Sequence, residues 1–189
     1  DILYILRVAE DLEKKPQPEL LKNKIMATMF FEPSTRTRLS FESAMNSLGG
    51  KVIGFADPQT TSAKKGETLW DTIKIVEGYS DVMVLRHSIE GAARLAAEAS
   101  SKPVINAGDG IHEHPTQGLL DLFTIRERKK KLEGLKVSII GDIAFSRVAR
   151  SNLWGLGKFG AKVTLCGPPT LMPRSVEQLG AKVTYSLQE

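Results

Sequence analysis

The sequence predicts an α/β fold of two parallel-sheet βαβ domains with helices on both faces, the second of them incomplete. Short apolar runs bounded by turn residues alternate along the chain with segments whose apolar residues recur at helical spacing. The alternation restarts after the charged stretch RERKKKLEG, which we interpret as a solvated helix end and a domain junction. The predicted domains are therefore 1–132 and 133–189.

Each segment of the first domain is justified by its own pattern. Residues 2–14 place apolar side chains near helical spacing, and KPQP ends the segment. The run NKIMATMFF (23–31) is short, apolar and bounded, like a buried strand. Pro33 and Ser34 open the next helix, which Gly49 and Gly50 end. The same reasoning predicts strands over 51–55, 81–87 and 102–108, helices over 67–79, 90–100 and 118–131, and polar loops over 56–66 and 109–117.

The second domain repeats the pattern over fewer residues. We expect a strand over 136–142, a helix over 146–160, a strand over 161–167, a short helix near 173–179 and a last strand, AKVTY. No covering helix follows that strand, so we expect a chain that has been cut short. The opening segment DILYILRVAEDLEKK is already helical in pattern, which indicates that the true start is missing as well.

Composition excludes several classes of protein. Hydrophobic residues make up 41% of the chain and charged residues 25%, as in an ordinary globular protein. The net charge of +4 would suit an anionic small substrate as well as nucleic acid, but no pattern of basic and aromatic residues supports nucleic acid. No apolar run approaches membrane length. The single cysteine, Cys166, excludes an intramolecular disulfide framework and predicts a reducing, cytoplasmic compartment.

Polar side chains follow four of the predicted strands. The stretches are EPSTRTR, DPQTTSAKK, RHS and GDGIHEHPTQ, and apart from their acids they carry cations, hydroxyls, His or Gln. In open parallel sheets, ligands bind beyond the carboxyl ends of the strands. The four stretches together predict one site for an anionic, partly carbonyl-like ligand.

The stretch PSTRTR is a candidate phosphate cradle. A helix N-terminus presents unpaired N–H groups, to which Ser34, Thr35 and Thr37 add hydroxyls and Arg36 adds a planar fork of donors. The alternative is that Ser34 merely caps the helix and the arginines are exposed, and this stretch alone leaves both open. A P-loop is excluded, because its glycines and its lysine–hydroxyl ending are absent. A structural ion pair suits Arg38 better than a ligand role.

Two further stretches offer donors and acceptors for a carbonyl or amide group. Pro115 holds His114 out of helical geometry, and a neutral imidazole can donate one hydrogen bond to a carbonyl oxygen. The side-chain carbonyl of Gln117 can accept from an amide N–H. Arg86 ends an apolar strand, where packing does not explain it, so we expect it to bind ligand. His112 and His114 lack the further Cys or His ligands of a metal site, so no metal is predicted.

The helix that follows GDIAF begins with two arginines in its first turn. Arg147 and Arg150 there oppose the helix dipole, and a carboxylate ligand would relieve this. Arg147 is therefore a candidate for binding an acidic co-substrate, and Arg150 for an interdomain or surface contact. The lone glycine before the helix is a weak dinucleotide signal, because the G-x-G-x-x-G fingerprint is absent.

With STRTR, KKGET, LRH…EGAARLA and HPTQ in this order, residues 1–165 resemble the catalytic chains of the aspartate carbamoyltransferase family. KKGET and NAGDG…HPTQGLLDLFTI favour the aspartate branch over the ornithine branch. The resemblance implies two α/β domains with the site between them, and no cofactor. It implies transfer of the carbamoyl group of carbamoyl phosphate to the amine of L-aspartate, an early step of de novo pyrimidine biosynthesis.

The resemblance also implies a role for each candidate residue. The phosphate would be bound by Ser34, Thr35, Arg36 and Thr37, the carbonyl oxygen by Arg86, His114 and Thr37, the amino group by Gln117 and a carboxylate of aspartate by Arg147. Arg86, His114, Thr37 and Arg36 would be the catalytic set. Lys65, with Thr61 or Ser62 beside it, would reach the site of a neighbouring subunit and bind aspartate there together with Arg147, which implies a homotrimer with shared active sites.

The chain departs from the family pattern in two ways. Phe145 replaces a common histidine, and the family's chain continues through a second aspartate-binding segment that is absent here. Two alternatives therefore stand beside aspartate transfer: an ornithine-type carbamoyltransferase, or, for this fragment, a carbamoyl-phosphate-binding module without activity. The sequence leaves open whether a regulatory chain or a fused pathway enzyme is a partner.

Overall fold

The computed structural model describes residues 1–57 and 62–188 of the chain. It consists of two compact units, Asp1–Gly110 and Ile111–Glu189, and each contains one parallel sheet with helices. The predicted α/β class with parallel sheets is thereby confirmed. The division after Gly110 reflects only the contacts within each unit and does not test where the domains meet. The predicted domain boundary after residue 132 therefore stays a prediction.

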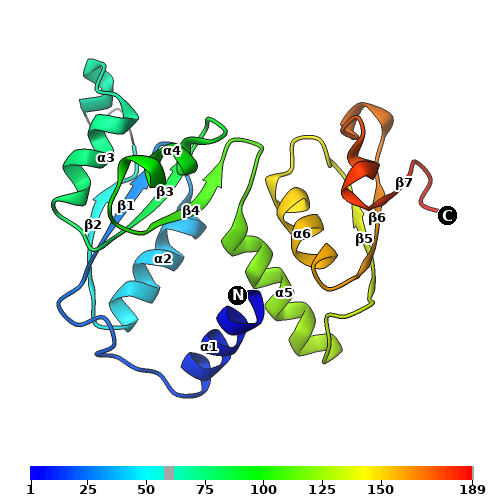
Figure 1. Ribbon diagram of the computed structural model, residues 1–189, viewed down its shortest axis with the longest axis horizontal. Helices are drawn as coiled ribbons and strands as arrows, with labels where there is room; N and C mark the ends of the chain where they lie inside the picture. Colours follow the sequence, from blue (N-terminus) through cyan, green and yellow to red (C-terminus); the bar gives the residue numbers. More distant parts are fainter. Residues whose placement is uncertain (58–61, 189) are drawn as a thin grey trace. The chain divides into compact units, whose positions relative to one another are not determined.

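The first unit alternates helices and strands through a four-stranded sheet of order β2-β1-β3-β4, in which all pairs are parallel (Figure 1). Its elements are α1 (Ile2–Lys14), β1 (Ile25–Phe30), α2 (Thr35–Ser47), β2 (Lys51–Phe55), η2 (Ser62–Lys65), α3 (Leu69–Glu77), β3 (Val82–His87), α4 (Ala92–Ala99) and β4 (Val104–Asp109).

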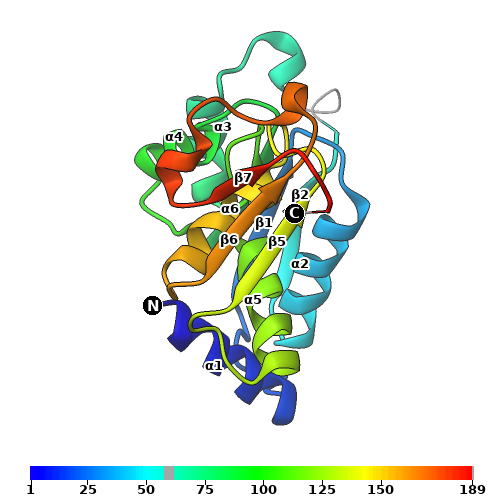
Figure 2. The same cartoon turned by 90° about the vertical axis from the view of Figure 1, so that its right-hand side faces the viewer.

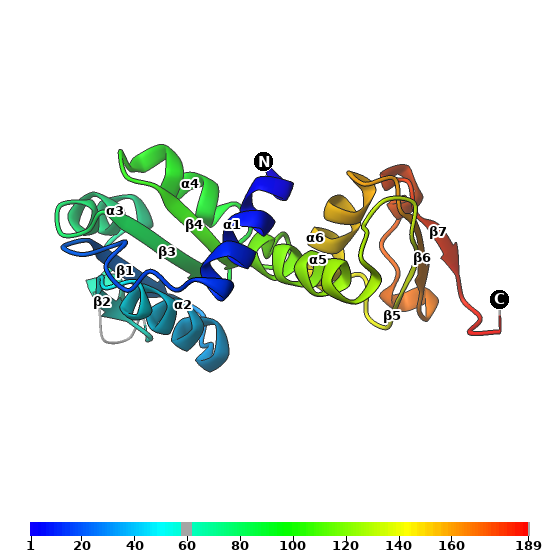
Figure 3. The same cartoon turned by 90° about the horizontal axis from the view of Figure 1, so that it is seen from below.

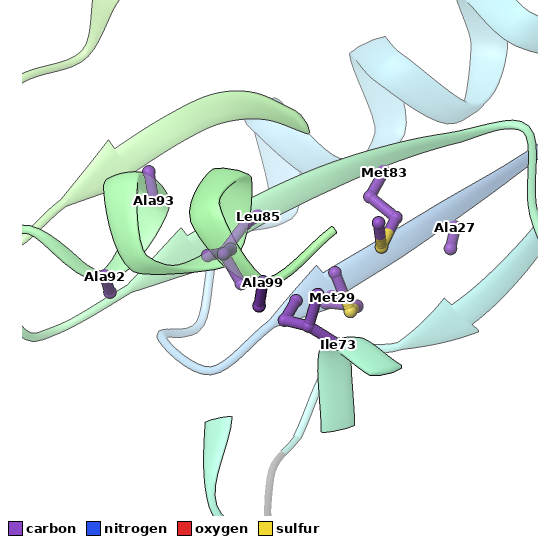
Figure 4. Close-up of a cluster of buried hydrophobic side chains, with 9 residues drawn as sticks. Ala27, Met29, Ile73, Met83, Leu85, Ala92, Ala93 and Ala99 are labelled. Carbon is purple, nitrogen blue, oxygen red and sulfur yellow. The ribbon is translucent and has the colours of Figure 1, made fainter. Parts of the chain in front are cut away.

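The core of the first unit has two layers, because alternate residues of a strand point to opposite faces of the sheet. Met26 and Phe30 of β1 pack with Met45 of α2 on one face. Met29 of β1 packs with Ile73 of α3 on the other face, where small alanines of α4 complete the cluster (Figure 4). Helix α2 therefore covers one face and helices α3 and α4 cover the other, as Figure 3 shows from below.

The second unit is built on a three-stranded parallel sheet of order β5-β6-β7 (Figure 2). Its elements are α5 (Pro115–Lys129), β5 (Lys136–Ile140), α6 (Arg147–Gly157), β6 (Lys162–Cys166), η3 (Pro169–Leu171), η4 (Val176–Leu179) and β7 (Lys182–Thr184).

Two glycines bring α5 and α6 close together. A Cβ atom added at Gly118 would lie 3.3 Å from the Cβ of Ser151, and one added at Gly155 would lie 3.0 Å from Leu122 Cδ1. Both distances are shorter than ordinary contacts, so a side chain at either position would require the facing residue to shift by a few tenths of an ångström.

Two predicted helices differ from the structure. Helix α5 begins at Pro115 and not at residue 118, because proline at the first helical position needs no N–H partner. The short helix expected near 173–179 is a single 3₁₀ turn, η4, and a second 3₁₀ turn, η3, precedes it. Prolines 168, 169 and 173 lack the N–H groups that a longer helix would need.

No helix within residues 1–57 and 62–188 has both the length and the apolar character needed to cross a membrane.

Glu77, at the end of α3, makes the first unit sensitive to acid. Its carboxylate accepts hydrogen bonds from the backbone N–H of Ser101 at 2.8 Å and from Lys74 Nζ at 3.1 Å. These contacts, the Ser101 hydrogen bond first, lower the pKa of Glu77 from 4.5 to about 2. A lowered carboxyl pKa stabilises the fold above the ordinary value, and this stabilisation is lost as pH falls from about 4.5 toward about 2.

We therefore expect Glu77→Gln to destabilise the chain at pH 6 and to have progressively less effect as the pH approaches 2. Urea unfolding midpoints across this range measure the difference. Glu98→Gln, which removes a carboxylate that contacts the exposed side chain of Arg94, is the matched control. Parallel pH profiles for the wild type and Glu77→Gln would contradict the assignment.

Candidate functional site

The N-terminus of α2 is not capped by a side chain of the described residues. Ser34 occupies the N-cap with extended backbone angles, φ −161° and ψ 109°, yet its side chain makes no capping hydrogen bond among the described residues. The N-cap residues of α3 and α6 behave differently: Thr68 accepts from the N–H of Asp71, and Ser146 accepts from that of Ala149. The structure thus does not support the reading of Ser34 as a simple helix cap, and the start of α2 can bind an anion.

The two arginines of STRTR have different surroundings. Arg38 Nε lies 3.8 Å from Glu42 Oε1, and Glu42 accepts a hydrogen bond from Thr28 Oγ1 at 3.2 Å, so the predicted structural ion pair of Arg38 is confirmed. Arg36 is exposed and forms no ion pair within the described part of the chain. Its guanidinium is therefore available to a ligand, next to the partly exposed Thr37.

Arg86 is held near the carboxyl end of β3, and one of its three side-chain nitrogens is buried without a partner among the described residues. It pairs in register with Phe30 of β1. Its Nη2 donates to Glu32 Oε1 at 2.8 Å, and its Nη1 donates to the carbonyl of Ala107 at 3.3 Å. Its Nε is buried and has no hydrogen-bond partner among the described residues. A buried N–H without an acceptor costs about 1–3 kcal/mol, which a bound oxygen atom would offset.

The carboxyl edge of the first sheet brings the start of α2 and Arg86 together. The N–H of Phe31 donates to the carbonyl of Arg86 at 2.9 Å, and α2 starts a few residues later at Thr35. The sheet edge near Arg86, the penultimate residue of β3, thus also carries Ser34, Thr35, Arg36 and Thr37.

Lys65 follows β2 in the 3₁₀ turn η2, where it is exposed. Ser62 opens that turn, and Thr61 lies outside the described residues. The choice between Thr61 and Ser62 as the hydroxyl beside Lys65 stays a prediction.

His87 has a structural role beside this edge. Its Nδ1 accepts the N–H of Ile89 at 2.9 Å, and its ring centroid lies 5.0 Å from that of Phe31. Burial lowers the pKa of His87, against the opposing effect of Glu32. The imidazole is therefore neutral at pH 7 and accepts a backbone hydrogen bond, as a structural residue does.

In the second unit, His114 is fixed at the N-cap of α5. It is 7% exposed and has the non-helical angles φ −139° and ψ 72°, so the predicted exclusion from helical geometry is confirmed. Its N–H donates to Ser151 Oγ at 2.9 Å, and Ser151 Oγ donates to Glu113 Oε2. Thr116 Oγ1 lies 3.4 Å from His114 Nδ1. These contacts hold the backbone that carries the imidazole.

Gln117 is oriented by the next turn of α5. Its Nε2 donates to Asp121 Oδ1 at 2.9 Å, and Asn152 Nδ2 of α6 donates to Asp121 Oδ2 at 2.6 Å. The expectation that the side-chain oxygen of Gln117 accepts from an amide stays a prediction. Arg147 is the first residue of α6, as predicted.

Sequence reasoning missed the residues that hold Arg86, His114 and Gln117 in place: Glu32, Glu113, Asp121, Ser151 and Asn152. Ser151 and Glu113 are 38 positions apart, and Arg86 and Glu32 are 54 apart. Spacing within a motif carries no information on such pairs. A weak signal existed in the second unit, where Ser151 and Asn152 directly follow the arginines of SRVAR.

Comparisons with known proteins agree on one family. The model of the aspartate/ornithine carbamoyltransferase carbamoyl-P binding domain matches residues 1–127. An aspartate carbamoyltransferase catalytic subunit from Thermococcus onnurineus is 53% identical, over 96% of this chain and 61% of the relative. The chain thus spans about three fifths of the length of that relative.

Solved structures agree with this relationship. Aspartate transcarbamoylase from Trypanosoma cruzi in complex with carbamoyl phosphate and aspartate has a TM-score of 0.90 at 37% identity, over 98% of this chain and 67% of that chain. The catalytic subunit of the M. jannaschii aspartate transcarbamoylase has a TM-score of 0.85 at 46% identity, over 99% and 65%.

The contact of Ser151 with the His114 backbone predicts a local effect of Ser151→Ala. The substitution keeps the Cβ that packs against Gly118 but leaves the N–H of His114 without its acceptor. We expect a loss of about 1–3 kcal/mol in unfolding free energy and faster hydrogen exchange at the His114 amide. Ser138→Ala, at an exposed position of β5, is the control. Unchanged exchange at His114 would contradict the contact.

Proposed function

The chain belongs to the aspartate/ornithine carbamoyltransferase family, and from this premise we propose that it binds carbamoyl phosphate at the carboxyl edge of its first sheet. We further propose that the enzyme transfers the carbamoyl group to the amine of L-aspartate, giving N-carbamoyl-L-aspartate and phosphate early in pyrimidine biosynthesis.

The observation that carries this proposal is Arg86 Nε, a buried donor without a partner among the described residues, at the sheet edge where α2 starts uncapped. An N–H donor of Arg86 suits the carbonyl oxygen of carbamoyl phosphate. The N–H groups at the start of α2, the hydroxyls of Ser34, Thr35 and Thr37 and the guanidinium of Arg36 suit its phosphate. The Trypanosoma cruzi enzyme with carbamoyl phosphate and aspartate bound supports this choice of ligands.

In the proposed mechanism, the aspartate amine attacks the carbamoyl carbon, the C–O bond to phosphate breaks, and the proton that the amine loses passes to the departing phosphate. Arg86, His114 and Thr37 stabilise the negative charge that develops on the carbonyl oxygen. Arg36 and the start of α2 stabilise the departing phosphate. Gln117 accepts from the amino group, and Arg147 holds a carboxylate of aspartate, so that the two reactants meet in a fixed geometry. No residue forms a covalent intermediate.

Aspartate is the acceptor that the relatives' names support. Ornithine transfer remains the alternative within the family, and assays with the two amines side by side distinguish them. The chain covers about three fifths of the Thermococcus relative, which favours carbamoyl phosphate binding as the first activity to measure on it.

We expect calorimetric titration with carbamoyl phosphate to show saturable binding that Arg86→Gln weakens by roughly 10- to 100-fold, the effect of a lost charge-assisted hydrogen bond of about 1.5–3 kcal/mol. Arg36→Gln should weaken it to a similar extent. Arg94→Gln removes the same charge from an exposed position of α4 and is the control. Equal affinity in the Arg86→Gln and Arg94→Gln variants would exclude the proposed site.

We also propose a cytoplasmic homotrimer in which Lys65, beside Thr61 or Ser62, completes the site of a neighbouring subunit. The support is the exposed position of Lys65 in η2 and the resemblance of KKGET to the family pattern. That the Thermococcus relative is a catalytic subunit supports a further, regulatory chain as a partner.

Shared sites make a prediction about mixed assemblies. Lys65→Ala and Arg86→Ala subunits, unfolded together and refolded, should form some sites with both residues intact and recover part of the transfer activity that each variant lacks. Sedimentation velocity confirms assembly before the assay. No recovery in correctly assembled mixtures would place Lys65 outside the neighbouring site.

A further inference from the structure

Arg150, which the proposed reaction does not use, lines a pocket in the second unit. The pocket has a volume of about 230 Å³, and Arg174 and Gln178 also line it. Its floor is apolar: Ala149 and Leu153 of α6, Leu165 of β6 and Val176 of η4 are all at most 7% exposed. The pocket thus combines a hydrocarbon floor with two cationic side chains.

The chain between β6 and β7 explains why the pocket exists. Helix α6 has 11 residues and extends about 16 Å, whereas η4 has four residues and extends about 8 Å. The shorter crossover covers less of the sheet face than a full helix would. A gap therefore stays open over Leu165, bounded on one side by α6 and on the other by η4.

Arg150 and Arg174 give the pocket its positive charge. Neither guanidinium makes an ion pair or hydrogen bond with any residue of the described ranges, 1–57 and 62–188. Arg150 is partly buried, so its charge is partly desolvated without compensation from an acid. An anionic group at this position would form charge-assisted hydrogen bonds that are roughly twice as strong as neutral ones.

We propose that this pocket binds a small organic carboxylate, with its apolar body over Leu165 and Val176 and its carboxylate between Arg150 and Arg174. The volume is below the roughly 300 Å³ at which pockets for drug-sized ligands begin, so the ligand is the size of one ring with a short acidic side chain. The pocket is lined by none of the residues proposed to bind carbamoyl phosphate or aspartate.

Phenylacetate is the probe, and phenylacetamide and acetate are its matched controls. The amide keeps the ring and removes the charge, and acetate keeps the charge and removes the ring. In titrations followed by amide ¹H–¹⁵N shifts, we expect phenylacetate to saturate the Leu153 and Val176 signals with a Kd on the order of millimolar. We expect each control compound to bind at least 10-fold more weakly.

Three variants assign the binding to the pocket. Arg150→Gln and Arg174→Gln should each weaken phenylacetate binding about 10-fold, whereas Arg128→Gln, on an exposed turn of α5, should leave it unchanged. Ala149→Val narrows the pocket wall without altering charge and should also weaken binding. Arg86→Gln, which disrupts the proposed carbamoyl phosphate site, should have no effect here.

Equal binding of phenylacetate and phenylacetamide, or unchanged affinity in both arginine variants, would overturn the carboxylate specificity. Absence of any shift at Leu153 and Val176 in the folded chain would overturn the pocket itself. If the chain fails to bind carbamoyl phosphate, the phenylacetate titrations can still be interpreted, because the two sites share no residue.

Discussion

The parallel pairing of β1 with β3 sets Phe30 opposite Arg86, and the arrangement of the first unit depends on it. The side chains of a strand alternate between the faces of the sheet, so a slip of one residue would move Met29 and Leu85 out of their core cluster and turn Arg86 to the other face. Core packing therefore fixes the register, and the register fixes the position of Arg86. The ion pair with Glu32 and the contact with the Ala107 carbonyl then hold the guanidinium at the sheet edge.

The second unit depends on the close approach of α5 and α6. Glycine costs a helix about 1 kcal/mol relative to alanine, yet Gly118 and Gly155 both lie within these helices. Their missing side chains let Ser151 reach the backbone of His114 and let Leu122 pack against the partner helix. The two glycines lower the stability of α5 and α6 locally, and they allow the close packing that holds His114 and Gln117 at the start of α5.

Local patterns predicted the elements well where packing agreed with them. The strands and helices of the first unit fall where apolar spacing and glycines placed them, and Arg38 forms its expected ion pair. The observed start of α5 and the 3₁₀ turn η4 differ from the predicted helices. The reason is that proline can begin a helix but disrupts one when it lies inside it. The residues that hold Arg86 and His114 were not predictable, since they come from distant parts of the chain.

By itself, the sequence determined the alternation of strands and helices, the parallel class of the sheets and the identity of the polar residues behind each strand. These follow from side-chain spacing and from the chemistry of single residues, which are local properties. The tertiary structure alone decided that Ser34 leaves the start of α2 uncapped, that Arg86 keeps one buried donor without a partner among the described residues, and that Arg150 and Arg174 share a pocket. Each of these depends on which atoms from distant segments come within hydrogen-bonding or van der Waals distance, and only folding brings those segments together.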